Sequence, residues 1–386
     1  MSWLVHHTRS EEYANHAAEH LRRNELPNAV ELYQLAAEAE ARALDSLAPD
    51  KMRTFGITAI SAVSLYYKAQ EYKTAKRLAY KCLAADILPL FAANELEELL
   101  QVIRYEESRS ESGIQFVEGE VLVSVSGGEI LYGAAPLELV SQKVEKVKNI
   151  FYRTTELLLD LPFRPRGEPN QSVKGKCDPW LLQAPAGSYQ FAVRVRKPQD
   201  FEQLDFIPDL ELRVERITKK FLEIVGAATR DPEGELIESV PKEDYRKSFL
   251  KLTRELAPPA SGKSFNQMEI KTSREIDSSP ILLIPETRKK IKKALQKAVP
   301  ENAESTDFIS TQIKGTLRGL QLDSDWIEIS IDNKNIRIYD AKDEIDDVIG
   351  PMVNKTVIVD VDENLSATSN AKKYSLRDIQ LEEDLN

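Results

Sequence analysis

The first hundred residues carry apolar side chains at intervals of three and four, a spacing that places them on one face of a helix. Alanines are dense between Glu11 and Leu47, and the segment from Asn24 to Pro27 interrupts the pattern in its middle. Because a proline costs little in the first turn of a helix, the interruption is typical of a turn between two helices. This stretch therefore predicts a helical hairpin.

The same arrangement returns further along the chain. The segment NELPNAVELYQLA at 24–36 is echoed by QEYKTAKRLAYKC at 70–82, and helices are predicted over 57–68 and 72–83. A shorter helix is expected over 95–103. A near-repeat of this kind predicts paired helices that stack side by side, a type of module that usually holds a partner and performs no chemistry.

These residues resemble the tetratricopeptide repeat (TPR) family in their small, bulky and aromatic positions, which are Tyr13, Ala17, Leu26, Ala29, Tyr33 and Ala36, then Tyr66, Tyr72, Ala75 and Cys82. The chain departs from the family at His20 and Ala79, where aromatic residues are common, and Ala29 and Ala75 lie 46 residues apart in place of 34. The resemblance implies a groove for a peptide or helix of a protein partner. The candidate contacts are Asn24, Tyr33, Tyr66, Lys68 and Lys76. The alternative is a plain bundle of four or five helices without a groove.

Beyond a polar linker at 106–112 the period changes to two, which is typical of strands. Residues 117–125 are expected to form a strand, Gly127–Gly128 a tight hairpin turn and residues 129–132 the return strand, followed by a long amphipathic helix over 136–161. The same patterns predict further strands over 180–183, 188–196, 268–270 and 281–284, and further helices over 210–228 and 242–256.

The last part of the chain alternates over five short strands, at 311–320, 326–331, 335–340, 355–361 and 375–381. A short helix is expected over 342–353. Five strands and one helix are enough for a small barrel of the Sm-like or OB-like kind. Over 340–386 twelve acidic residues face five basic ones, which argues against a phosphate-binding surface there.

The predicted fold class is therefore multidomain α+β. It comprises TPR-like helical hairpins over 1–104, an α+β domain over 114–300 and a small β-rich module over 306–386. The layout of the chain beyond its helical region resembles that of uncharacterised bacterial proteins, and this resemblance implies no activity.

Two segments are basic in a chain whose net charge is −11. The first follows the long helix and contains Arg164, Arg166, Lys174 and Lys176. The second is a short predicted helix with six basic and no acidic residues: Arg288, Lys289, Lys290, Lys292, Lys293 and Lys297. Such segments contact phosphates or an acidic partner in other proteins. They support an alternative function, an RNA- or DNA-binding accessory factor, for instance in a bacterial defence or toxin–antitoxin system. The competing interpretation is a solvated basic face that balances the acidic tail.

Two glycine-containing segments imitate phosphate loops without the required spacing. Gly127–Gly128 is not followed by the lysine and serine or threonine that such a loop needs. The sequence SGKS at 261–264 ends like a phosphate loop, but Ala257 stands where its first glycine belongs, and two prolines follow. We therefore expect no nucleotide cofactor.

Histidine and cysteine are too scarce for the common catalytic or metal sites. The histidines all lie near the start of the chain, and His16 and His20 share a helix face without an evident third metal ligand. Cys82 and Cys177 cannot form a disulfide framework and suit a reducing cytosol. No apolar run approaches the length of a membrane span. The sequence thus predicts a cytoplasmic, non-catalytic adaptor without cofactor or metal, although a site made of carboxylates or lysines alone would leave no signature.

Overall fold

The computed structural model describes residues 2–48, 50–85, 87–165, 167–183, 189–197, 216–272, 279–297, 309–321, 323–332, 334–341, 349–365 and 372–382. Several predicted features lie outside these residues, namely Arg166, the start of the predicted helix over 210–228 and most of the predicted helix over 342–353. The chain forms two compact units, Met1–Gln115 and Phe116–Asn386, each with its own hydrophobic clusters.

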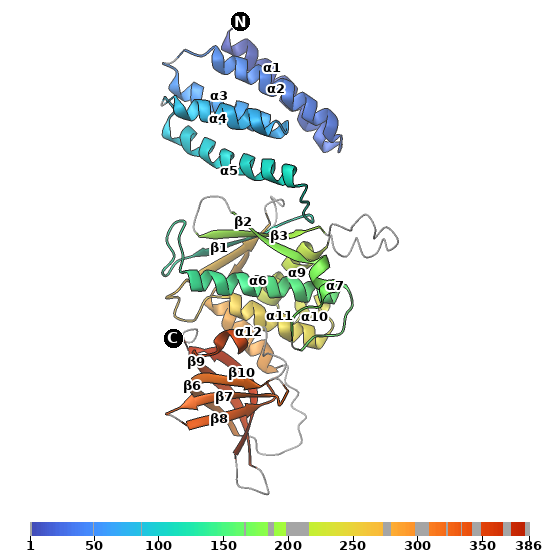
Figure 1. Ribbon diagram of the computed structural model, residues 1–386, viewed down its shortest axis with the longest axis vertical. Coiled ribbons are helices and arrows are strands. Elements are labelled where there is room, and N and C mark those ends of the chain that lie inside the picture. The colour runs from blue at the N-terminus through green and yellow to red at the C-terminus, as the bar shows by residue number, and fades with distance from the viewer. Residues whose placement is uncertain are drawn as a thin grey trace. The chain divides into compact units, whose positions relative to one another are not determined.

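The described part of the first unit is helical (Figure 1). Its helices are α1 (Trp3–Arg22), α2 (Leu26–Asp45), α3 (Met52–Lys68), α4 (Tyr72–Ala84) and α5 (Leu90–Ser112). The two predicted hairpins are confirmed as the pairs α1–α2 and α3–α4. The predicted linker at 106–112 is wrong, because α5 continues through this polar segment to Ser112 and is followed by Gly113, whose φ of 65° is left-handed.

The near-repeat in the sequence is also a repeat in backbone geometry. Asn24 and Gln70 occupy equivalent turn positions, and both are left-handed, with φ of 61° and 60°. The residue after each turn position donates its backbone N–H to a carbonyl five residues earlier, at 3.0 Å in both hairpins. Ala29 and Ala75 are fully buried at equivalent places, where small side chains let paired helices approach closely.

The second unit begins with a five-stranded antiparallel sheet in the order β2-β3-β1-β4-β5. The strands are β1 (Val121–Ser126), β2 (Asp178–Gln183), β3 (Gln190–Arg196), β4 (Gln267–Lys271) and β5 (Ile281–Leu283). Helices cover one face of this sheet, as Figure 1 shows, and share a core with it. They are α6 (Leu137–Leu158), α7 (Gln171–Lys176), α9 (Ile217–Arg230), α10 (Glu235–Ser239), α11 (Glu243–Leu256) and α12 (Pro285–Lys297).

The predicted hairpin at Gly127–Gly128 is wrong, because β1 pairs with β3 and β4 and the predicted return strand forms no ladder. Both glycines have a positive φ and pack against the loop that precedes β4. A Cβ atom on Gly128 would lie 2.3 Å from the Lys263 carbonyl oxygen, and one on Gly127 would lie 2.0 Å from the Asn266 side chain. These glycines therefore serve the close contact of two loops.

The C-terminal strands close into a five-stranded barrel in the order β10-β8-β7-β6-β9. The strands are β6 (Ile309–Gln321), β7 (Trp326–Ile331), β8 (Lys334–Tyr339), β9 (Thr356–Leu365) and β10 (Lys372–Leu381). A 3₁₀ turn, η3 (Gly350–Met352), contributes Met352 to the barrel core. Neighbouring strands are antiparallel except β8 and β10, which pair in parallel and complete the barrel.

Candidate functional site

The structure separates the five predicted partner contacts of the helical unit. Tyr33 is buried in the core shared by α1, α2 and α3, and Tyr66 is half-buried in the same core, so both rings pack within the unit. Lys76 forms an ion pair with Glu107 of α5. Asn24 and Lys68 are exposed, and the Lys68 ammonium lies 5.5 Å from the centre of the Tyr33 ring. Burial therefore removes Tyr33 from a groove surface, while Asn24 and Lys68 remain predicted contacts.

The repeat defines a pair of corresponding helix faces that the sequence prediction missed. The equivalent turn residues Asn24 and Gln70 are 46 residues apart, so each position on α1 corresponds to the position 46 residues later on α3. At intervals of three and four, one face of α1 carries Asn15, Ala18 and Arg22, and its equivalent on α3 carries Ser61, Ser64 and Lys68. All six are exposed or half-buried. We call these six residues the repeated face. On each helix it consists of two short side chains followed by one basic residue.

Large apolar side chains are exposed unevenly along the described chain. Seventeen are exposed, and eleven of them lie in the first unit, which is less than a third of the protein: Leu4, Val5, Leu21, Leu26, Leu35, Met52, Ile57, Tyr80, Leu90, Phe91 and Val102. Single exposed apolar residues are ordinary on a protein surface, whereas a contiguous exposed patch is typical of a surface that contacts another macromolecule.

The first predicted basic segment is largely engaged within the protein. Arg164 contacts the buried Glu156 at 2.7 Å, Lys174 pairs with Glu168, and Lys176 donates to the Ser172 hydroxyl at 2.8 Å. Residues 171–176 form the short helix α7, which the sequence analysis did not predict. These contacts leave the segment poorly suited to hold phosphates.

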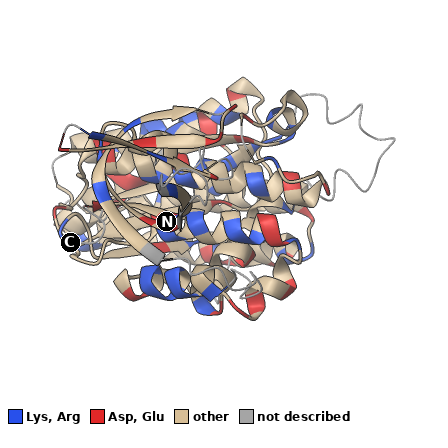
Figure 2. Ribbon diagram, turned by 90° about the horizontal axis from the view of Figure 1, so that it is seen from below, with Lys and Arg blue, Asp and Glu red and all other residues tan. Residues whose placement is uncertain are grey.

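The second basic segment, on α12, is also mostly engaged. Arg288 is buried and contacts the Glu255 carboxylate at 3.2 Å, which corrects its prediction as a surface contact. Lys290 donates to the Arg230 carbonyl, Lys292 lies 3.3 Å from Asp360 of β9, and Lys297 lies 3.0 Å from Glu233. The two remaining basic residues of the segment are exposed: Lys289 and Lys293. Figure 2 shows acidic and basic residues interspersed along the helices.

A cluster of buried charges joins α6 and α11 to α12 and the barrel. Four buried cations surround the buried Glu255 carboxylate: Lys143, Lys146, Arg254 and Arg288. Burial alone would raise the pKa of this carboxyl, but the four positive charges outweigh burial and lower the pKa to about 2. Arg254 also reaches β10, where it donates to both carboxylate oxygens of Asp378 at 2.8 Å. The cluster is therefore a buried ionic link between helices and barrel.

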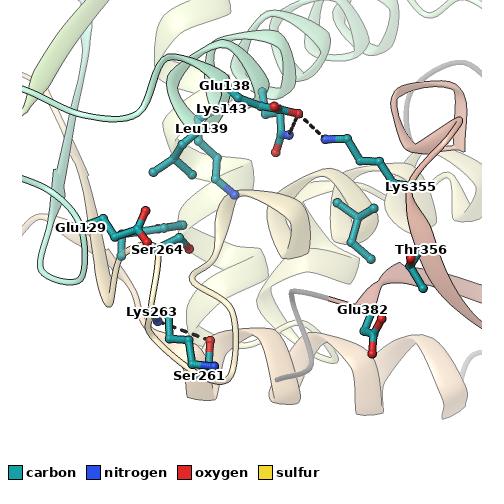
Figure 3. Close-up of a pocket in the computed structure, with 13 residues that line it drawn as sticks. Glu129, Glu138, Leu139, Lys143, Ser261, Lys263, Ser264, Lys355, Thr356 and Glu382 are labelled. Atoms are coloured by element: carbon teal, nitrogen blue, oxygen red, sulfur yellow. Dashed lines mark hydrogen bonds and ion pairs between the residues drawn. The ribbon is translucent and has the colours of Figure 1, made fainter.

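A cavity of about 780 Å³ lies beside this cluster. Its walls come from the N-terminal part of α6, the loop over 261–265, and the barrel strands β9 and β10 with their adjoining residues. Figure 3 shows Lys143 extending from α6 toward the interior, with Lys263 and Lys355 on opposite sides. The two glycine-containing segments that imitate phosphate loops therefore meet at the edge of one cavity, which their distance in sequence did not predict.

The barrel carries an aromatic pair on adjacent strands. Trp326 of β7 lies directly opposite Tyr339 of β8, and both rings are half-buried. The Arg337 guanidinium lies 4.5 Å from the Trp326 ring centre, and the Lys373 ammonium lies 5.0 Å from the Tyr339 ring centre. The predicted basic segments lacked interleaved aromatic residues, whereas this surface combines aromatic rings with cations.

The described cysteine and histidine residues show no arrangement typical of a catalytic or metal site. Cys177 is fully buried, and burial raises the pKa of its thiol to about 12, so it does not supply a thiolate near neutral pH. His20 contacts Glu25 at 2.5 Å. No group of three or more histidine, cysteine, aspartate or glutamate side chains in the described ranges is arranged to hold a metal ion.

None of the described helices combines the length and the apolar character needed to cross a membrane. Comparison of the chain with protein-family models, curated proteins and solved structures finds no match.

Proposed function

We propose that the chain is a non-catalytic adaptor that docks a segment of a protein partner on its first unit, and that this unit is TPR-like. The observation that carries the proposal is the repeated face, which presents the same kind of surface on α1 and on α3. Small side chains such as Ala18 and Ser64 leave room for the close approach of a partner segment. Arg22 and Lys68, at the ends of these faces, supply positive charge for a partner carboxylate.

The enrichment of exposed apolar side chains on the first unit supports the same proposal. A partner helix or extended peptide would bury part of this apolar surface, and burial of apolar area provides most of the free energy of protein association. The buried Tyr33 and the half-buried Tyr66 pack in the core shared by α1, α2 and α3 and fix the spacing between the hairpins.

Capture from the organism's own cells tests the proposal. The full chain is used as bait beside two variants that place an arginine at a polar position, Ser64→Arg on the repeated face and Gln34→Arg on the exposed side of α2. We expect a protein to be retained in stoichiometric amount by the wild type and by Gln34→Arg, and to be lost with Ser64→Arg, with retention unchanged by nuclease. The absence of any stoichiometric protein partner, or a partner insensitive to Ser64→Arg, would contradict the proposal.

A second candidate function, binding of single-stranded nucleic acid, is favoured by the aromatic pair on the barrel. We propose that the barrel is OB-like rather than Sm-like, because an OB-like barrel closes through parallel third and fifth strands and here β8 and β10 pair in parallel. Bases stack on aromatic side chains and phosphates pair with cations, and Trp326, Tyr339 and Arg337 provide both. Glu328 contacts Arg337 at 3.3 Å and neutralises part of its charge.

Fluorescence anisotropy with a labelled single-stranded oligonucleotide at two salt concentrations tests this second function. We expect binding at low salt with a steep salt dependence, and a loss of about fivefold or more in Trp326→Ala, since stacking of one base contributes about 1–3 kcal/mol. An absence of binding at low salt removes this function and leaves the adaptor proposal untouched.

A further inference from the structure

We propose that the cavity between α6, the loop over 261–265 and the barrel binds a small organic anion, a carboxylate or a phosphate that carries an apolar group. This site lies in the second unit and is independent of partner docking by the first. Four features of the cavity support the proposal: the placement of charge with depth, the buried cations behind it, its apolar floor and its size.

Charge in the cavity changes with depth. Three lysines and three glutamates are among its lining residues, and of the charged lining residues that the structure describes Lys143 alone is buried, with 6% of its surface exposed. Glu138, by contrast, is 71% exposed and forms an ion pair with Lys355, and Glu129 is exposed. The floor of the cavity is therefore cationic, whereas its rim is mixed in charge.

The buried charge cluster places four cations behind the floor, around the carboxylates of Glu255 and Asp378. Lys143 contributes to both places, since its ammonium donates to the Glu255 carbonyl oxygen at 2.6 Å and its side chain lines the cavity. Lys146, Arg254 and Arg288 lie around the same glutamate. Charges buried in a low-dielectric interior are screened less than surface charges, so the buried cations would attract an anion bound at the floor.

The remainder of the floor is apolar. Phe265 and Leu381 are buried, and the Lys143 ammonium lies 4.9 Å from the centre of the Phe265 ring. Hydroxyl groups of Ser261, Ser264 and Thr356 line the walls and supply hydrogen-bond donors for an anionic head. A cation beside a ring and a leucine suits a ligand that has a negative head and an apolar body.

The size and the rim select a small molecule over a polymer. A volume of about 780 Å³ falls in the range of pockets that enclose drug-sized ligands. The rim is mixed in charge, with Glu138 paired to Lys355 and Glu382 paired to Lys314, so it offers little net attraction to a polyanion such as a nucleic-acid backbone.

Titration of the full-length chain with four probes tests the proposal, using ligand-observed NMR and calorimetry. The probes are phenyl phosphate, benzoate, inorganic phosphate and benzyl alcohol. We expect saturable one-to-one binding of phenyl phosphate or benzoate at millimolar concentration or below, and the tighter of the two identifies the head group. Inorganic phosphate lacks the apolar body and benzyl alcohol lacks the charge, so both should bind more weakly.

Variants locate the binding. Lys143→Met should weaken the tighter probe by about tenfold or more, because a charge-assisted hydrogen bond to the anion is lost, and Lys143→Arg should restore most of the affinity. Lys289→Met, at an exposed site on α12 outside the cavity lining, should change nothing. If Lys143→Met does not fold, the exposed rim variant Lys263→Met replaces it, with an expected weakening of a few fold. The proposal is overturned if neither anionic probe binds saturably, if benzyl alcohol binds as tightly as benzoate, or if the cavity variants bind like the wild type.

Discussion

The two units of this protein differ in how many charged side chains they bury. In the described part of the first unit, Glu40 is the one buried charged residue, and its carboxylate contacts His7 at 3.0 Å. The described part of the second unit buries eight charged side chains: Lys143, Lys146, Arg153, Glu156, Arg254, Glu255, Arg288 and Glu363. The core of the first unit instead relies on alanines, such as Ala29 and Ala75.

This difference shows what each unit is suited to do. Alanine packing joins helices that are neighbours in sequence, so the first unit is assembled from local contacts and leaves long helix faces exposed. The ionic cluster of the second unit joins elements more than a hundred residues apart, as the contact between Arg254 and Asp378 illustrates. We therefore expect substitutions in the two units to differ in size and in their response to pH.

The largest expected effect is the loss of the ionic link in the second unit. Arg254→Met removes one partner of a buried pair and leaves the Asp378 carboxylate, together with part of the Glu255 charge, uncompensated. Removal of one member of a buried ion pair typically costs about 3–5 kcal/mol of unfolding free energy. Urea unfolding of the full chain measures it, with Lys247→Met, whose partner Glu243 is exposed, as the control. A loss below about 1 kcal/mol, as for surface pairs, would contradict the structural role of the cluster.

A smaller effect is expected from overpacking the first unit. Ala75→Leu adds a large side chain at a fully buried position, and overpacking of a dense core costs about 1–3 kcal/mol. The exposed neighbour Thr74→Leu should cost much less. Thermal unfolding followed by circular dichroism separates the two variants, and equal stability of both would mean that α4 does not pack through Ala75.

Acid should affect the second unit through its carboxylates. The folded-state pKa of Glu255 is about 2, below its ordinary 4.5, and Arg254 outweighs burial to lower the pKa of Asp378 as well. A lowered folded-state pKa contributes stability above the unfolded-state pKa, and this stability is lost as pH falls toward the folded-state value. We expect the unfolding free energy of the second unit to fall between about pH 4.5 and pH 2, and Asp378→Asn to lose part of this dependence. A pH dependence identical in the variant and the wild type would contradict the prediction.

The smallest expected effect concerns the two equivalent turns. Gln70 and Asn24 share a left-handed conformation that glycine adopts without strain, and asparagine tolerates it better than glutamine. Gln70→Gly should therefore stabilise the first unit by up to about 1 kcal/mol, and Asn24→Gly by less. Chemical denaturation of the two variants checks this order, and destabilisation by Gln70→Gly would show that its side chain matters more than its backbone.

The elements of both units were largely predictable, because each depends on local periodicity. The helices over 57–68 and 72–83 agree with α3 and α4 within a few residues, and the strands at 326–331 and 335–340 agree with β7 and β8. The error at Gly127–Gly128 has a physical reason: a positive φ is needed equally for a hairpin turn and for close contact between two loops. Sequence alone does not distinguish these uses, since the loop that contacts Gly128 lies more than a hundred residues away.

The candidate sites were less predictable. The burial of Lys143 and Lys146 was not predicted, since burial of a lysine depends on partners such as Glu255 that no local pattern reveals. Tyr33 was predicted to contact a partner although its ring fills the core between hairpins. The repeated face could have been found from the sequence by carrying the 46-residue offset back from Ser64 to Ala18.

Site-specific photo-crosslinking tests the adaptor proposal most directly. A benzophenone side chain replaces Ser64 on the repeated face or, in a matched chain, Gln34 on α2, and each protein is irradiated in its own cells. We predict one dominant protein adduct from position 64 that is absent from position 34. Docking on this face would be contradicted if both positions gave equal amounts of adduct. It would also be contradicted if position 64 gave no adduct although the full-length chain was present and folded.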